Sequence, residues 1–232
     1  MSMPRHPVVT AIVAAVLAVG SGAASAHSDD SVLAPASPAE YQELSARWWQ
    51  WAASTPFSAQ GPFGQAGTDC SQSQPAGHTW FLAGQFTDLP AERTCTIPAG
   101  TLLFLPLINV ECSSLEGPPF QGDTPAQRRA CVQKADFDMI PLAAELDGEP
   151  ITAHLPTRTV ISPDFRIRAV DGNPASIPTG SGFSTSKGIW LLLAPLSPGK
   201  HLLHFAGAIP AFNFAPEATY HLTVSRPARH GR

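Results

Sequence analysis

Histidines are the side chains of this sequence best suited to metal chemistry. Cleavage after Ala26 would leave His27 at the N-terminus, where its α-amino group and imidazole could together hold copper. His201 and His204 alternate along one expected strand and point to opposite faces, so only one of them can join His221 on the next strand. We predict no cofactor and no metal site, and we keep His27, His201 and His221 as the alternative ligands of a copper histidine-brace oxidase.

Acidic side chains could supply hydrolytic chemistry. Two carboxyl groups about 5 to 9.5 Å apart can hydrolyse a glycosidic bond. Six candidates lie in or near the loops of the first half: Asp69, Glu111, Glu116, Asp123, Asp136 and Asp138. Nucleophilic catalysis has less support, because Ser184-x-x-Lys187 leads into an expected strand and no Gly-x-Ser-x-Gly motif occurs. A carboxylate-pair hydrolase therefore stays an alternative, and enzymatic activity stays open.

Aromatic side chains favour a different chemistry, the binding of poorly charged ligands. Ring faces stack on sugars and on apolar molecules, and a groove could form from Trp49, Phe57, Phe63, Phe120 and Phe183. Only 14% of the residues are charged, which also favours a binder over a hydrolase. We predict an exported, non-catalytic binding or structural domain for a carbohydrate or another poorly charged small molecule. The predicted ligand-binding residues are Trp49, Arg47, Asn109 and Glu111.

The N-terminal segment indicates export. Residues 1–26 combine a short basic start, an apolar run and an Ala-Ser-Ala end, which is typical of a signal peptide. We expect a flexible lead at 27–36, a single domain at 37–225 and a disordered tail at 226–232. The net charge of −4 and the lack of a basic patch exclude nucleic acid as a partner. After cleavage we expect no membrane segment and a secreted or periplasmic protein, whose oligomeric state the sequence does not indicate.

Four cysteines in an exported chain predict two disulfides. Three connectivities are possible, and sequence order favours Cys70 with Cys95 and Cys112 with Cys131. Each bridge would then contribute about 3 kcal/mol in the chain-entropy model. A zinc site is the rival interpretation, but no two cysteines have the close spacing of a structural zinc knuckle.

Two helices are expected, both in the first half. Ser37-Pro38-Ala39-Glu40 is a capping box with proline at the first helical position, and Pro56 ends the helix that it starts. At 100° per residue, Tyr41, Leu44, Trp48 and Trp51 form one apolar stripe. Thr124-Pro125-Ala126-Gln127 repeats the capping box and starts a short helix to about residue 135.

Short apolar runs separated by turns predict about nine strands. Residues 78–86 and 101–110 should form the centre of the core, with a bulge or an edge at Pro106. Asp147-Gly148 predicts a hairpin. Further strands are expected at 142–146, 149–155, 158–161, 165–170, 189–194, 200–205 and 219–224. The last three should form an antiparallel meander. The fold class is all-β, an antiparallel β-sandwich with an N-terminal helix and a second short helix; the alternative is a two-layer α+β fold.

Five motifs together resemble a family of exported bacterial proteins of unknown function. They are Arg47-Trp48-Trp49-Gln50-Trp51, Trp80–Gly84, Cys95 with Ile97–Gly100, Leu103–Asn109, and Trp190–Leu196 followed by Pro198–His201. The resemblance spans most of the chain after residue 26 and implies export and a single domain. It implies no activity, because that family has no established substrate or active site.

Overall fold

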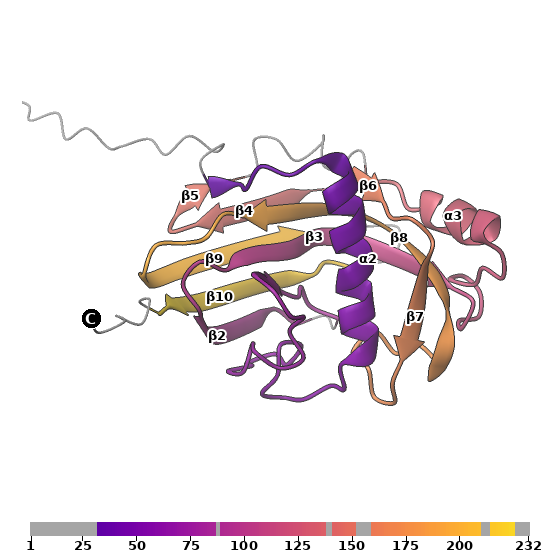
Figure 1. The fold of residues 1–232 in the computed structure, drawn as a ribbon, viewed down its shortest axis with the longest axis horizontal. Helices are drawn as coiled ribbons and strands as arrows, with labels where there is room; N and C mark the ends of the chain where they lie inside the picture. Colours follow the sequence, from indigo (N-terminus) through magenta and orange to yellow (C-terminus); the bar gives the residue numbers. More distant parts are fainter. Residues whose placement is uncertain (1–31, 87–88, 138–140, 152–158, 210–213, 226–232) are drawn as a thin grey trace, which may run out of the picture.

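The computed structural model describes residues 32–86, 89–137, 141–151, 159–209 and 214–225. Within these ranges the chain forms two β-sheets and two helices (Figure 1). The predicted fold class, a β-sandwich with an N-terminal helix and a second short helix, is confirmed. The expected signal peptide and tail lie outside the described residues, as does 27–31 of the expected lead. None of the described helices is long and apolar enough to cross a membrane.

The first sheet contains β1 (Thr79–Phe81), β3 (Leu102–Ser113), β6 (Thr159–Ile161), β7 (Phe165–Ala169) and β8 (Gly180–Leu193). Its centre is the antiparallel pair of the two long strands, β3 and β8. β1 joins β3 in parallel, whereas β6 and β7 both pair with the other edge of β8. The two long strands therefore run the length of the first sheet.

The second sheet contains β2 (Ala91–Ile97), β4 (Leu142–Leu146), β5 (Glu149–Pro150), β9 (Gly199–Gly207) and β10 (Glu217–Val224). The strand order is β2-β10-β9-β4-β5, with β2 and β10 parallel and the other neighbours antiparallel. Asp147 and Gly148 have φ values of 55° and 85°, and the hairpin predicted there is confirmed.

Both helices begin as predicted. α2 (Pro38–Ser54) starts at a capping box in which Ser37 and Glu40 bond each other's backbone N–H groups. α3 (Pro125–Gln133) starts at the equivalent box of Thr124 and Gln127. α2 lies across the strands in Figure 1, and its stripe residues Tyr41, Leu44, Trp48 and Trp51 are all buried.

The sandwich has three layers, and the first sheet is the middle one. Phe104 and Trp190 on one face of this sheet pack with α2. Leu105 and Leu191 on the other face pack with Leu203 and the rest of the second sheet. Because both faces are covered here, residues 102–108 of β3 and 189–193 of β8 are apolar without interruption.

A β-bulge in β3 changes which side chains face α2. The register against β8 shifts between Pro106 and Ile108, as predicted for a proline within a strand. Before the bulge, Phe104 faces α2; after it, the odd-numbered Asn109 and Glu111 do. The strand end beyond the bulge is therefore polar on the helix side.

Three local predictions were wrong. Residues 91–97 were expected to be a polar connection but form β2, with alternating buried and exposed side chains. The expected meander does not form, because β8 belongs to the first sheet while β9 and β10 belong to the second. Part of the lead expected to be flexible packs against β8, where Leu33 is buried and the Ala34 N–H donates to the Leu192 carbonyl.

Both predicted disulfides are present. Cys70–Cys95 ties the loop after α2 to β2, and Cys112–Cys131 ties the end of β3 to α3. The second bridge closes the segment 113–130, which folds back so that the Ser113 N–H donates to the Phe120 carbonyl at 3.0 Å. No free cysteine occurs among the described residues, so the zinc interpretation is wrong for this set of four.

Candidate functional site

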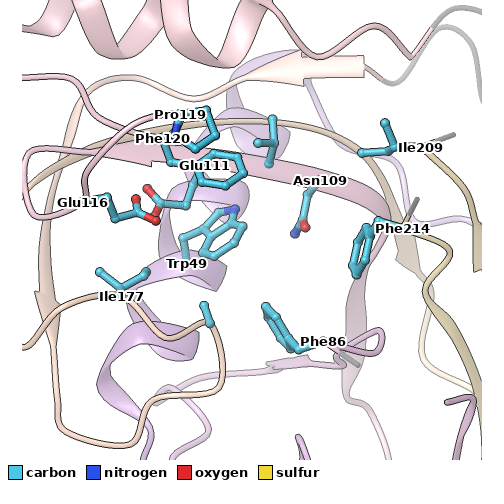
Figure 2. A pocket seen from close by; sticks show the side chains of 12 residues that line it. Trp49, Phe86, Asn109, Glu111, Glu116, Pro119, Phe120, Ile177, Ile209 and Phe214 are labelled. Carbon is cyan, nitrogen blue, oxygen red and sulfur yellow. The ribbon is translucent and has the colours of Figure 1, made fainter. Parts of the chain in front are cut away.

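A pocket of about 440 Å³ lies between the C-terminal part of α2, the polar end of β3 and four loops (Figure 2). Its walls are mainly apolar. They consist of Trp49, Phe86, Asn109, Val110, Glu111, Glu116, Pro119, Phe120, Ala175, Ile177, Ile209 and Phe214. The volume falls within the range of about 300–1,000 Å³ of small-molecule sites.

Hydrogen bonds or a disulfide hold three of these loops in place. The side chain of Asn173 donates to the carbonyls of Val170 and Ile177 and accepts from the Ile177 N–H. Backbone hydrogen bonds join Ile209 and Phe214 in both directions. The loop of Glu116 and Phe120 is closed by the Cys112–Cys131 bridge. Contacts within the fold therefore fix these parts of the pocket wall.

Trp49 lines this pocket and has a buried, unpaired indole N–H among the described residues. The ring is 5% exposed and packs edge-on against Trp48 at 5.2 Å and Phe86 at 6.5 Å between centroids. Its neighbour Trp48 donates its Nε1–H to the Leu82 carbonyl at 2.9 Å, whereas Nε1 of Trp49 has no hydrogen-bond partner among the described residues. A buried indole N–H usually has one.

Asn109 is placed in the pocket by the bulge and by a glycine opposite it. Gly188 is its partner in β8, and a Cβ on that glycine would lie 2.9 Å from the Cβ of Asn109 and 2.5 Å from Nε1 of Trp190. Glycine is therefore needed to make room for both side chains. Nδ2 of Asn109 is buried and, within the described part of the chain, has no hydrogen-bond partner.

Glu111 is a buried acid that lies beside a second one. It is 4% exposed and accepts a hydrogen bond from the Ser184 hydroxyl, while the neighbouring Glu116 accepts one from Ser113 at 2.8 Å. Burial raises the pKa of Glu111 well above its ordinary value, and Glu116 raises it further through a hydrogen bond and its charge, against the opposing effect of Ser184. Burial and the neighbouring Glu116 therefore both favour the protonated form of Glu111.

The two carboxyl groups lie close enough to interact as a pair. Ionised carboxylates cannot hydrogen-bond one another, so Oε1 of Glu111 lacks a partner unless one of the pair carries a proton. With the proton bound to Glu111, that carboxyl can donate to Glu116. Figure 2 shows the pair at one end of the pocket and the amide of Asn109 on the other side of Trp49.

Three of the five buried side-chain atoms without a partner in the described structure belong to this pocket: Nε1 of Trp49, Nδ2 of Asn109 and Oε1 of Glu111. A hollow of similar volume lined by Pro38, Gln42 and Arg129, among others, contains none of them. Unpaired buried polar groups are rare in native proteins. Their convergence on one apolar pocket marks it as the candidate site.

Three of the four residues predicted to bind a ligand line the pocket. Trp49, Asn109 and Glu111 do, whereas Arg47 lies half-buried on α2 and is not part of the wall. Whether they bind a ligand stays a prediction.

The groove that was expected from five aromatic residues does not form. Trp49 and Phe120 share the pocket, but Phe57 and Phe183 are exposed and Phe63 packs on Trp51. Sequence reasoning missed Phe86 and Phe214 as wall residues. Both lie in loops, where no periodicity points to a common site.

The histidine alternative is wrong for the pair His201 and His221. In the β9–β10 register His201 is opposite Leu222 and His221 is opposite Leu202, so the two imidazoles lie on opposite faces of the sheet. His27 lies outside the described residues. Nowhere in the described ranges are three or more His, Cys, Asp or Glu side chains grouped to hold a metal ion. The absence of a cofactor stays a prediction.

Ser197, His201 and Asp147 resemble a catalytic triad, but their hydrogen bonds only join two neighbouring turns. Nδ1 of His201 lies 2.7 Å from Asp147, while Nε2 lies 2.8 Å from the backbone carbonyl of Ser197 and 3.4 Å from its hydroxyl. Nε2 therefore donates to the carbonyl and cannot deprotonate the hydroxyl. Burial lowers the pKa of His201, but the hydrogen bonds to Asp147 and Ser197 outweigh it and raise the pKa overall.

Comparisons with known proteins assign neither a family nor a function to this chain. No protein-family model and no curated protein matches the sequence. Three solved structures align with 64% of this chain and almost all of their own: PbICP-C in complex with falcipain-2 (13% identity, TM-score 0.26), the cysteine protease inhibitor EhICP2 from Entamoeba histolytica (12%, 0.24) and amebosin (11%, 0.22). TM-scores this low carry no argument about function.

Replacing Glu111 with glutamine is expected to stabilise the protein at neutral pH. Because the pKa of Glu111 in the folded protein lies above 4.5, the unfolded chain binds fewer protons once the pH exceeds 4.5. The free energy of unfolding therefore falls as the pH rises through this range. Glutamine keeps the shape of the side chain and can accept the hydrogen bond from Ser184. Because it does not ionise, the loss of stability with rising pH is removed.

Urea unfolding of the wild type and of Glu111→Gln at pH 7 and pH 4 measures the effect. We expect a higher midpoint for the variant at pH 7 and a smaller difference at pH 4, where the unfolded chain also holds the proton. An equal or lower midpoint at pH 7 would show that Glu111 is not a buried, protonated acid.

Proposed function

We propose that this protein is an exported binding domain whose ligand is a small, largely apolar molecule with one polar group. The observation that carries the proposal is the convergence of Nε1 of Trp49 and Nδ2 of Asn109, two buried donors without partners in the described structure, on an apolar pocket. A ligand oxygen placed between them would satisfy both donors. The rest of the ligand would bury apolar surface against the aromatic walls.

The apolar walls favour a hydrophobic ligand over a soluble carbohydrate. A sugar carries a hydroxyl group on most of its carbons, and each buried hydroxyl needs a hydrogen-bond partner. Four of the twelve wall residues have polar side chains, Trp49, Asn109, Glu111 and Glu116, and the other eight are apolar. One polar group on the ligand matches this arrangement better than a ring of hydroxyl groups.

A carboxylate-pair hydrolase is the second candidate, and the pairing of Glu111 with Glu116 favours it. A protonated acid beside an ionised one is the arrangement that general acid–base catalysis requires. Two features argue for binding instead. One oxygen of each carboxyl group accepts a hydrogen bond from a serine hydroxyl, and the surrounding wall is too apolar to hold a glycoside.

The proposal predicts saturable binding of 2-naphthol, a two-ring aromatic alcohol small enough for the pocket. In Trp49→Phe we expect binding about tenfold weaker, because phenylalanine keeps an aromatic wall but removes the indole donor. Isothermal titration calorimetry of both proteins measures the difference.

Trp80→Phe is the matched control. Trp80 is half-buried and lies outside the pocket wall, so this variant should bind 2-naphthol like the wild type. A wild type that shows no binding, or two variants with equal losses, would overturn the proposed site.

A further inference from the structure

The charges around the pocket restrict the polar group that a ligand can bring. Glu111 and Glu116 are the only wall residues in the described structure that can carry a charge, and both are acidic. No lysine, arginine or histidine lies among the wall residues. The pair bears one negative charge when it holds one proton. Any ligand group must therefore be compatible with an acidic and desolvated end of the pocket.

The hydrogen-bonding groups of the pocket are of two kinds. Trp49 and Asn109 supply N–H donors without partners among the described residues, and the carboxyl pair supplies acceptor oxygens. A group that both accepts and donates, placed between Trp49 and the pair, would use both kinds. An alcohol or phenol hydroxyl does so, because its oxygen has lone pairs and its proton can be donated.

We propose that the pocket selects hydroxylated hydrophobic molecules, alcohols or phenols, whose oxygen accepts from the indole N–H of Trp49 while the hydroxyl proton is donated to the Glu111–Glu116 pair. This inference rests on the proposed function and specifies the ligand class of the same site.

Three other ligand classes use the site less well. A carboxylate would bring a second negative charge beside the acidic pair, with no basic side chain to neutralise it. An ammonium group has no lone pair and leaves both N–H donors unpaired. An ether satisfies the donors but has no proton for the carboxyl pair.

A matched series with one aromatic body separates these classes. The probes are 2-naphthol, 2-methoxynaphthalene, 2-naphthoate and 2-naphthylmethylammonium, each titrated into the wild-type protein by calorimetry at pH 7. We expect 2-naphthol to bind at least about tenfold more tightly than each of the other three.

Glu116→Gln tests the electrostatic part of the proposal independently of protein stability, because the expected change is a gain: 2-naphthoate should bind more tightly relative to 2-naphthol. The variant keeps a hydrogen-bond acceptor for Ser113 and removes the negative charge. We expect the preference for 2-naphthol over 2-naphthoate to narrow by about tenfold. Glu145→Gln, on an exposed position of β4, is the control and should leave the preference unchanged.

Each outcome decides the proposal. Equal affinities for 2-naphthol and 2-methoxynaphthalene would show that the hydroxyl proton is not used. A tighter-binding naphthoate or ammonium, or an unchanged preference in Glu116→Gln, would overturn the charge argument. In these cases the binding function would stand and the ligand class would be wrong. If none of the four probes binds, the proposed function itself is contradicted and the inference with it.

Discussion

Replacing Arg93 with methionine is expected to lower the free energy of unfolding by about 3 kcal/mol or more. Arg93 is fully buried in β2, and all of its hydrogen bonds in the described structure end on neutral oxygens. It donates to the carbonyls of Gly64, Ala83 and Gly84, and to the hydroxyl of Tyr220 at 2.7 Å. Methionine fills similar volume but leaves these buried acceptors without their donor.

The loss should be large because Arg93 joins three segments. Gly64 lies in the loop after α2, Ala83 follows β1, and Tyr220 is the partner of Arg93 in the parallel β2–β10 pair. Chemical denaturation with Arg168→Met as the control measures the effect, since Arg168 is exposed on β7. A similar shift for the two variants would show that Arg93 contributes only as an ordinary surface arginine.

Loss of the Cys70–Cys95 disulfide in Cys95→Ser is expected to destabilise the protein by about 2 to 5 kcal/mol. The bridge links residues 25 positions apart and fastens a long loop to β2. Without it the unfolded chain gains conformational freedom, and the loop around Gly64 loses its covalent attachment. Guanidinium melts of the wild type and the variant measure the change. An unshifted midpoint would mean that packing and Arg93 alone hold this loop.

The features that short segments encode were predicted correctly from the sequence. Both capping boxes, the Asp147-Gly148 hairpin and the bulge at Pro106 depend on residues within a few positions of one another. The disulfide pairing followed sequence order, and this sufficed because each bridge closes a short loop. Local steric and hydrogen-bonding rules determine such features, so no knowledge of the fold was needed.

Strand β2 was missed because its inward side chains include a charged one. Its buried positions are Ala91, Arg93, Cys95 and Ile97, and an arginine among them hides the alternation of apolar residues. The burial of Arg93 depends on acceptors contributed by distant segments. The parallel pairing of β2 with β10 joins residues more than a hundred positions apart, so no local pattern can indicate it.

The candidate site was predicted only in part for the same reason. Asn109 and Glu111 stand out because they are polar residues at the end of an apolar strand, and Trp49 because it lies at the margin of a helical stripe. Phe86, Glu116 and Phe214 come from separate loops that meet only in the folded chain. The bulge changes which residues of β3 face α2 and directs Asn109 towards Trp49. This change becomes apparent only from the strand register.

The indole N–H resonance of Trp49 tests the central claim most directly. The chain has five tryptophans, so a ¹⁵N–¹H spectrum resolves few indole signals, and that of Trp48, already bonded to the Leu82 carbonyl, is the internal control. On titration with 2-naphthol we predict a saturable downfield shift of the Trp49 signal, as its N–H gains an acceptor, with the Trp48 signal nearly unchanged. A Trp49 signal that stays in place at saturating 2-naphthol would contradict the claim that this pocket binds its ligand through the unpaired indole.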